Sequence, residues 1–109
     1  MQPIHKDLAG GRWQTMTLAQ QLGNVGSEYE RALSGKEQGD TNRFENAFAR
    51  MLELLDLTIT DPRWKNHRLK ELVRLREVVC QELDGENGQS PSQASLQNYF
   101  LYFGILARS

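Results

Sequence analysis

The sequence predicts an all-α protein, an antiparallel up-down-up-down four-helix bundle. Apolar residues recur at helical spacing in four segments after residue 15. Short connections separate these segments, which favours antiparallel neighbours. No alternating β-branched run and no hairpin turn between two strand patterns supports a sheet. We expect residues 1–14 to form a flexible N-terminal segment and residues 15–109 to form a single four-helix domain, which is long enough for one core.

The first helix is expected to begin at Thr17, because "TLAQ" is a capping box in which Gln20 reaches back to the cap. Its core stripe consists of Leu18, Leu22, Val25, Tyr29 and Leu33. Gly23 and Gly26 lie beside this stripe, although each glycine inside a helix costs about 1 kcal/mol relative to alanine. We favour a close approach of a second helix as their reason; the alternative is a ligand that passes over bare backbone.

Asp40 or Asn42 can cap the second helix. Its core face consists of Phe44, Phe48, Met51, Leu52, Leu55 and Ile59. Ala47, Leu54 and Thr58 widen that face, so we expect this helix to be the most buried. It ends near Asp61, since Pro62 disfavours a helical conformation in the residue before it.

The third helix runs to about Asp84 and begins either at Pro62 or after a short turn. Its apolar stripe comprises Leu69, Leu72, Val73, Val79, Cys80 and Leu83. Arg76 lies in the middle of that stripe, and a buried unpaired charge is very costly. We therefore expect a buried polar network in which Glu28, or failing that Asp56, pairs with Arg76. The functional alternative is that these three residues line an anion or substrate pocket.

The fourth helix follows a second capping box at Ser90, with Pro91 in its first position. Its buried residues are expected to be Leu96, Tyr99, Phe100, Phe103, Leu106 and Ala107. Leu101, Tyr102 and Ile105 point to the other side, and no helix of a four-helix monomer is enclosed. These three residues predict an oligomer contact; the alternative is that they are simply exposed.

Several classes of function lack the residues they need. A single cysteine, Cys80, excludes an internal disulfide and a cysteine-based zinc site. No Glu-x-x-His pair supports a di-iron centre, and no glycine-rich phosphate loop is present. We therefore expect no metal, no cofactor and no enzymatic activity. No apolar run approaches a membrane span, and the first residues lack the apolar centre of a secretory signal, so we expect a cytoplasmic protein.

One local signal points to nucleic acid. The candidate nucleic-acid face comprises Arg63, Trp64, Lys65, Arg68, Lys70 and Arg74. Cations can contact phosphates and the indole can stack on a base. The whole chain carries a formal net charge of -1, however, so nucleic-acid binding is not the favoured interpretation.

Four stretches also resemble a known family. "GSEYERA", "RMLELLDLTITDPRW", "RLKELVRLREVVC" and the closing "YFLYFGILAR" are similar to segments of a family of small, uncharacterised prokaryotic proteins. The resemblance implies an all-helical intracellular protein and adds no chemistry. The leading hypothesis is therefore a self-associating interaction or scaffold module that is not an enzyme. An RNA- or DNA-contacting accessory protein is the second hypothesis, and a small-molecule binder is the third.

Overall fold

The structure is a computed structural model that describes residues 11–84 and 91–108. It contains four α-helices, α2 (Leu18–Glu37), α3 (Thr41–Ile59), α4 (Leu69–Asp84) and α5 (Pro91–Ala107). Two short 3-10 helices, η1 (Arg12–Thr15) and η2 (Pro62–Trp64), precede α2 and α4. The described part of the chain contains no strand, which confirms the all-α, four-helix class. Ser90 and residues 1–10, on which other predictions were made, lie outside the described residues.

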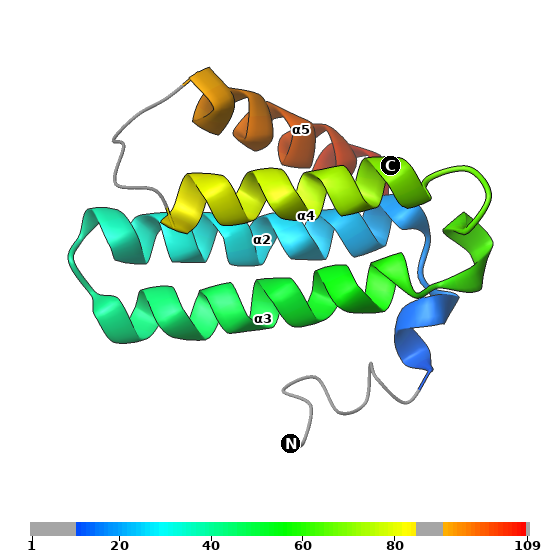
Figure 1. The fold of residues 1–109 in the computed structure, drawn as a ribbon, viewed down its shortest axis with the longest axis horizontal. Helices are drawn as coiled ribbons and strands as arrows, with labels where there is room; N and C mark the ends of the chain where they lie inside the picture. Colours follow the sequence, from blue (N-terminus) through cyan, green and yellow to red (C-terminus); the bar gives the residue numbers. More distant parts are fainter. Residues whose placement is uncertain (1–10, 85–90, 109) are drawn as a thin grey trace.

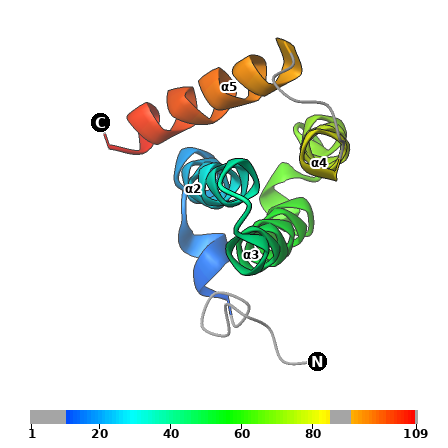
Figure 2. The ribbon, with the colours of Figure 1, turned by 90° about the vertical axis from the view of Figure 1, so that its left-hand side faces the viewer.

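The fourth helix crosses the other three. Helices α2, α3 and α4 lie side by side, and α5 runs obliquely above α2 and α4 (Figure 1). Seen along the three aligned helices, α5 lies across the view (Figure 2). Its most extensive packing is against α2. The prediction of four aligned, alternating helices is therefore only partly met, because the last helix is laid over the others.

The predicted starts of α2 and α3 are confirmed. The backbone N–H of Gln20 donates to Thr17 Oγ1 at 3.1 Å, and the Thr17 N–H donates to Gln20 Oε1 at 2.9 Å. Asp40 caps α3 by accepting the Arg43 N–H at 3.1 Å. A separate helix η2 precedes α4, so the short-turn alternative holds.

The ordered domain begins earlier than residue 15. Trp13 of η1 is fully buried, and its indole Nε1 donates to Thr58 Oγ1 of α3 at 2.9 Å. The predicted boundary is therefore too late in the chain, because an aromatic residue ahead of α2 completes the core.

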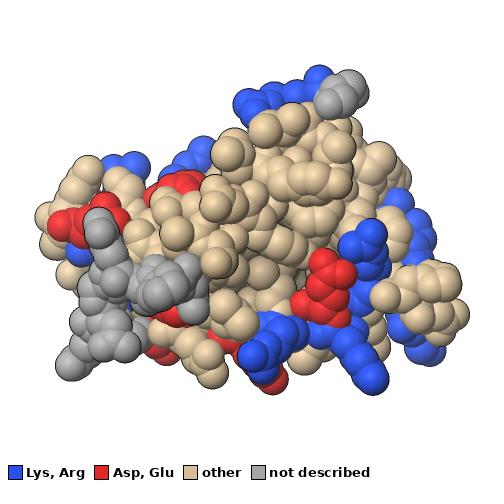
Figure 3. Space-filling view, turned by 90° about the horizontal axis from the view of Figure 1, so that it is seen from above, with Lys and Arg blue, Asp and Glu red and all other residues tan. Residues whose placement is uncertain are grey.

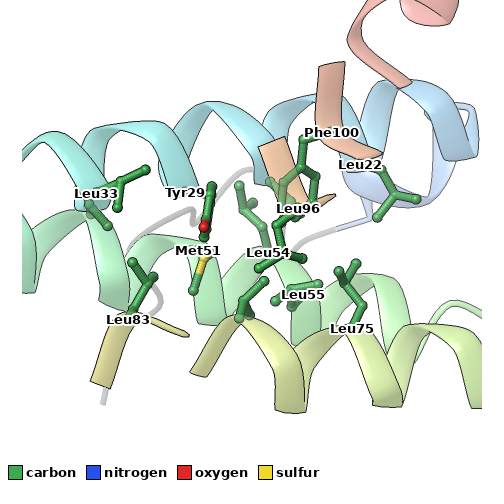
Figure 4. Close-up of a cluster of buried hydrophobic side chains, with 14 of the residues drawn as sticks. Leu22, Tyr29, Leu33, Met51, Leu54, Leu55, Leu75, Leu83, Leu96 and Phe100 are labelled. Atoms are coloured by element: carbon green, nitrogen blue, oxygen red, sulfur yellow. The ribbon is translucent and has the colours of Figure 1, made fainter. Parts of the chain in front are cut away.

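The hydrophobic core lies between the helices, and its side chains come from α2, α3, α4 and α5 (Figure 4). Helix α2 buries nine residues, including Leu22, Val25 and Tyr29, whereas α3 buries five. The prediction that the second helix is the most buried is wrong. Helix α2 is covered by both α3 and α5, whereas α3 makes its main contact with α2.

The buried stripe of α4 differs from the predicted one. It consists of Leu72, Leu75, Val79 and Leu83, whereas Leu69 and Val73 remain 36% and 40% exposed. The observed stripe has the same helical spacing as the predicted one but is rotated about the helix axis, so that Leu75 takes the central position. On α5, Leu96 and Phe100 are buried, but Leu106 is 44% exposed, contrary to prediction.

Gly26 explains how closely α5 approaches α2. A Cβ atom placed on Gly26 would lie 2.6 Å from Phe100 Cβ, which is too close for two carbon atoms that are not bonded to each other. A Cβ on Gly23 would lie 3.5 Å from Gly104 Cα, an ordinary contact. The prediction of a close helix–helix approach is therefore confirmed, and Gly26 is the position that requires it.

Gly26→Ala should lower the free energy of unfolding by about 1–3 kcal/mol, because Phe100 must move out of its packed position. Gly23→Ala is the matched control, and it should be neutral or raise stability by up to about 1 kcal/mol through helix propensity. Urea denaturation of both variants checks this. Equal losses in the two variants would contradict the assigned contact.

The Tyr29 hydroxyl is buried in the core, where its oxygen has no hydrogen-bond partner among the described residues (Figure 4). Burial, with a smaller contribution from nearby glutamates, raises the pKa of Tyr29 to about 12. The ring itself packs on Phe100, with the centroids 5.4 Å apart. The ring therefore contributes to the core, and the hydroxyl only bears a desolvation cost.

Tyr29→Phe should leave the free energy of unfolding unchanged or raise it by about 1 kcal/mol, because it removes an unpaired buried group and keeps the ring. Thermal unfolding followed by circular dichroism measures the difference. A clear loss of stability would mean that the hydroxyl has a partner.

Candidate protein interface

The outer face of α5, defined here as Leu101, Tyr102, Ile105 and Leu106, is apolar and open. These side chains are between 44% and 57% exposed. The predicted exposure of the first three is thus confirmed, whereas their role as an oligomer contact stays a prediction. Residues at such spacing lie on one side of a helix. Together they expose roughly 400 Å² of apolar surface, in the range where patches on monomers are often functional.

No charge interrupts this face. The α5 segment, "PSQASLQNYFLYFGILA", contains no Lys, Arg, Asp or Glu. Figure 3, which looks down on α5, shows a broad area without charged side chains, and the charged groups lie towards its margins. A partner surface would therefore have no charge to desolvate on this helix.

A groove runs beside this face, between α5 and α2. It measures about 510 Å³. Its walls combine small residues, including Gly23, Ser27 and Gly104, with polar ones such as Asn24. Leu101 belongs both to this α2–α5 groove and to the outer face of α5. The groove and the apolar face therefore form one continuous surface.

A second groove, of about 410 Å³, separates α5 from α4. Its apolar floor includes Leu75, Leu96 and Tyr99. The Tyr99 hydroxyl donates to Glu71 Oε1 at 2.8 Å, and burial together with this bond raises the pKa of Tyr99. This hydrogen bond joins α5 to α4 across the groove, so this side of α5 contacts the rest of the monomer.

The predicted buried network around Arg76 is wrong. Arg76 Nε donates to Asp56 Oδ1 at 2.8 Å, and the two side chains are 38% and 57% exposed. Because Leu75 occupies the core position, Arg76 lies at the edge of the interface between α3 and α4. Asp56, the second choice of partner, is the one observed. Such exposed pairs typically contribute less than about 1 kcal/mol.

Glu28, the first choice of partner, meets other arginines. Its carboxylate is buried and accepts from Arg31 at 2.6 Å and from Arg50 at 3.2 Å. The Arg50 pair links α2 to α3. Glu28 and Arg76 therefore have separate partners, and the alternative of a pocket lined by Arg76, Glu28 and Asp56 together is not supported by these contacts.

Acidic residues partner the three arginines of the candidate nucleic-acid face. Arg63 pairs with Asp61 at 2.7 Å, and Arg68 pairs with Glu71 at 3.1 Å. Arg74 is 4.0 Å from Glu77. Lys65 and Lys70 are exposed. The strip is thus a series of ion pairs more than an open cationic surface.

Trp64, the aromatic member of that face, is also engaged. Its indole Nε1 donates to Gln21 Oε1 at 2.8 Å, and the Arg63 guanidinium lies 4.5 Å from its ring centre. The ring is therefore occupied by the protein's own cation, which leaves less of it to stack on a base.

A buried polar cluster, which the sequence does not reveal, closes this end of the molecule. It comprises Trp13, Gln21, Thr58 and Asp61, with Arg63 at its edge. Gln21 Nε2 donates to the Trp13 carbonyl at 2.9 Å and to Asp61 Oδ2 at 3.0 Å. Asp61 also accepts from the Arg63 guanidinium. The cluster ties η1, α2, α3 and η2 together, and its paired groups indicate a structural role.

Other kinds of site find no support in the described ranges. No group of three or more His, Cys, Asp or Glu residues could hold a metal ion there. No helix in those ranges is long and apolar enough to cross a membrane. Cys80 is half-buried, and burial raises the pKa of its thiol, which disfavours the reactive thiolate.

Asp61→Asn should lower the free energy of unfolding at pH 7 by about 1–3 kcal/mol, because Gln21 and Arg63 lose a buried acceptor charge. The hydrogen bonds from Arg63 hold the pKa of Asp61 below its usual value. This contribution is therefore complete above the unfolded-state pKa of about 4 and is lost as the pH falls through the folded-state value.

The gap between wild type and Asp61→Asn should consequently narrow as the pH is lowered from 7 towards 3 in guanidinium titrations. Asp56→Asn, which removes an exposed partner of Arg76, is the matched control and should cost less than about 1 kcal/mol. If both substitutions lowered the free energy of unfolding by the same amount, the stabilising role assigned to the buried polar cluster would be wrong.

Comparison with known proteins adds no assignment: no family model, no curated protein and no solved structure matches the chain. The resemblance to a prokaryotic family therefore stays a prediction, and the helical architecture stands on the structure alone.

Proposed function

We propose that the protein is a non-enzymatic interaction module that self-associates through the outer face of α5. One observation carries this proposal: Leu101, Tyr102, Ile105 and Leu106 form a contiguous, half-exposed apolar face on a helix without charge. Contiguous apolar patches of this size commonly mark binding surfaces.

The expected affinity is modest. Covering roughly 400 Å² on each of two copies corresponds to about 20 kcal/mol of gross hydrophobic gain. Association costs an estimated 4–15 kcal/mol in lost freedom, and ordering of side chains adds to that. A stable interface typically covers about 800 Å² on each partner, so this face alone supports a reversible contact.

The second hypothesis, contact with RNA or DNA through the start of α4, has weaker support. Its arginines already pair with Asp61, Glu71 and Glu77. A phosphate backbone would have to displace these acids, whereas the outer face of α5 needs only to lose water. The apolar face is therefore the better-supported surface.

Tyr102→Glu and Ile105→Glu should each weaken self-association by at least about tenfold, because each places a charge in an apolar contact. Sedimentation velocity over a series of concentrations measures the effect, and circular dichroism checks that each variant folds. Ala49→Glu adds the same charge at an exposed position on α3 and should leave self-association unchanged.

A wild-type chain that stays monomeric at high micromolar concentration would contradict the proposal. Glutamate variants that associate as strongly as wild type would also contradict it, since the contact would then lie elsewhere.

A further inference from the structure

We infer that two copies associate by crossing α5 over α5 in antiparallel directions, with Gly104 at the crossing point. Each copy then lies along the α2–α5 groove of the other. This inference rests on the proposed self-association. It specifies which helices meet, their relative direction and the residue at which they come closest.

Gly104 is the first observation. A Cβ atom added there meets no atom within 4 Å, although the residue lies inside α5. Gly26 behaves in the opposite way, because its missing side chain is what admits Phe100. Glycine inside a helix is less favourable than alanine. The folded monomer therefore has no steric reason for glycine at 104, whereas the close approach of a second backbone supplies one.

The position of Gly104 is the second observation. Gln97, Leu101, Gly104 and Arg108 follow one another at helical spacing, and all four line the α2–α5 groove. Leu101 also belongs to the exposed outer face of α5. A helix that enters the groove therefore meets the bare backbone of Gly104 and covers part of the apolar face.

Charge complementarity selects a second copy as the occupant. Glu30 of α2 and Arg108 both line the groove, and they lie towards opposite ends of it relative to Gly104. Glu30 is near the Gln97 amide, at 3.5 Å, and Arg108 makes no ion pair with a described residue. In an antiparallel crossing centred on residue 104, position 108 of one copy lies opposite position 100 of the other.

Position 97 of the other copy lies about one helical turn beyond position 100, and the long Arg108 side chain spans that turn to reach Glu30. A twofold axis repeats the contact, so the two copies form two Arg108–Glu30 pairs. Because α5 itself carries no charge, nothing else in the crossing opposes the pairing. The groove also adds covered area to Leu101, the member of the outer face that lines it.

The first experiment separates folding from association with Gly104→Ala. The substitution should raise the melting temperature of the dilute monomer by about 2–6 °C, because alanine fits and favours the helix. It should weaken self-association by at least about tenfold, because the added methyl group lies where the second backbone crosses. Asn46→Ala, an exposed substitution on α3, also raises helix propensity and should leave association unchanged.

The second experiment tests the direction of crossing. Glu30→Arg and Arg108→Glu should each weaken self-association by about fivefold or more, because each places like charges together at both ends. An equimolar mixture of the two variants should restore association to within about twofold of wild type, since each Arg then meets a Glu across the interface.

The outcomes distinguish this inference from the proposed function. If the wild type dimerises but Gly104→Ala leaves its dissociation constant unchanged, and mixing the two charge variants restores no association, the crossing at Gly104 is wrong and self-association stands. If the wild type remains monomeric at the highest concentration reached, both the proposed self-association and the crossing at Gly104 are wrong. The apolar face would then have to bind a different protein.

Discussion

The contact between Gly26 and Phe100 determines where α5 lies, and the exposed surfaces of the molecule follow from it. Without a side chain at residue 26, the Phe100 ring comes close to the α2 backbone and packs against Tyr29 and Tyr99. At this close contact α5 crosses α2 obliquely (Figure 2). A crossing helix is covered near its contact point only, so its outer face and the two flanking grooves stay open.

The charged groups of the described helices follow the same division. They lie on α2, α3, α4 and the short helices η1 and η2, and most of the arginines there have acidic partners. Glu28 joins α2 to α3 through Arg50, and Asp61 fixes η2 to α2 through Gln21. Helix α5 takes no part in this network, apart from neutral hydrogen-bonding groups such as the Tyr99 hydroxyl. One side of the protein is therefore held by polar pairs, and the other presents an apolar surface.

The features that the sequence predicts correctly depend on residues close together in the chain. The Thr17 and Asp40 caps need a partner three residues away, and the exposure of Leu101 and Ile105 follows from an apolar pattern wider than one face. The rotation of α4 was not predictable, because two stripes of equal spacing compete and only tertiary packing chooses between them. Arg76 consequently pairs with Asp56 at the surface. The Asp61 cluster joins residues about 40 positions apart, and no local pattern signals such pairing.

The two glycines at the crossing of α2 and α5 show what the structure adds to such patterns. Gly26 and Gly104 both lie inside helices, where glycine is less favourable than alanine. In the fold, Gly26 has a close neighbour in Phe100, whereas the side-chain position of Gly104 faces open space. Packing within the monomer requires glycine at position 26. Glycine at position 104 lowers the stability of the helix, and no contact within the monomer requires it. This difference is the ground on which we propose a contact between copies at Gly104, which lines the groove that adjoins the apolar face.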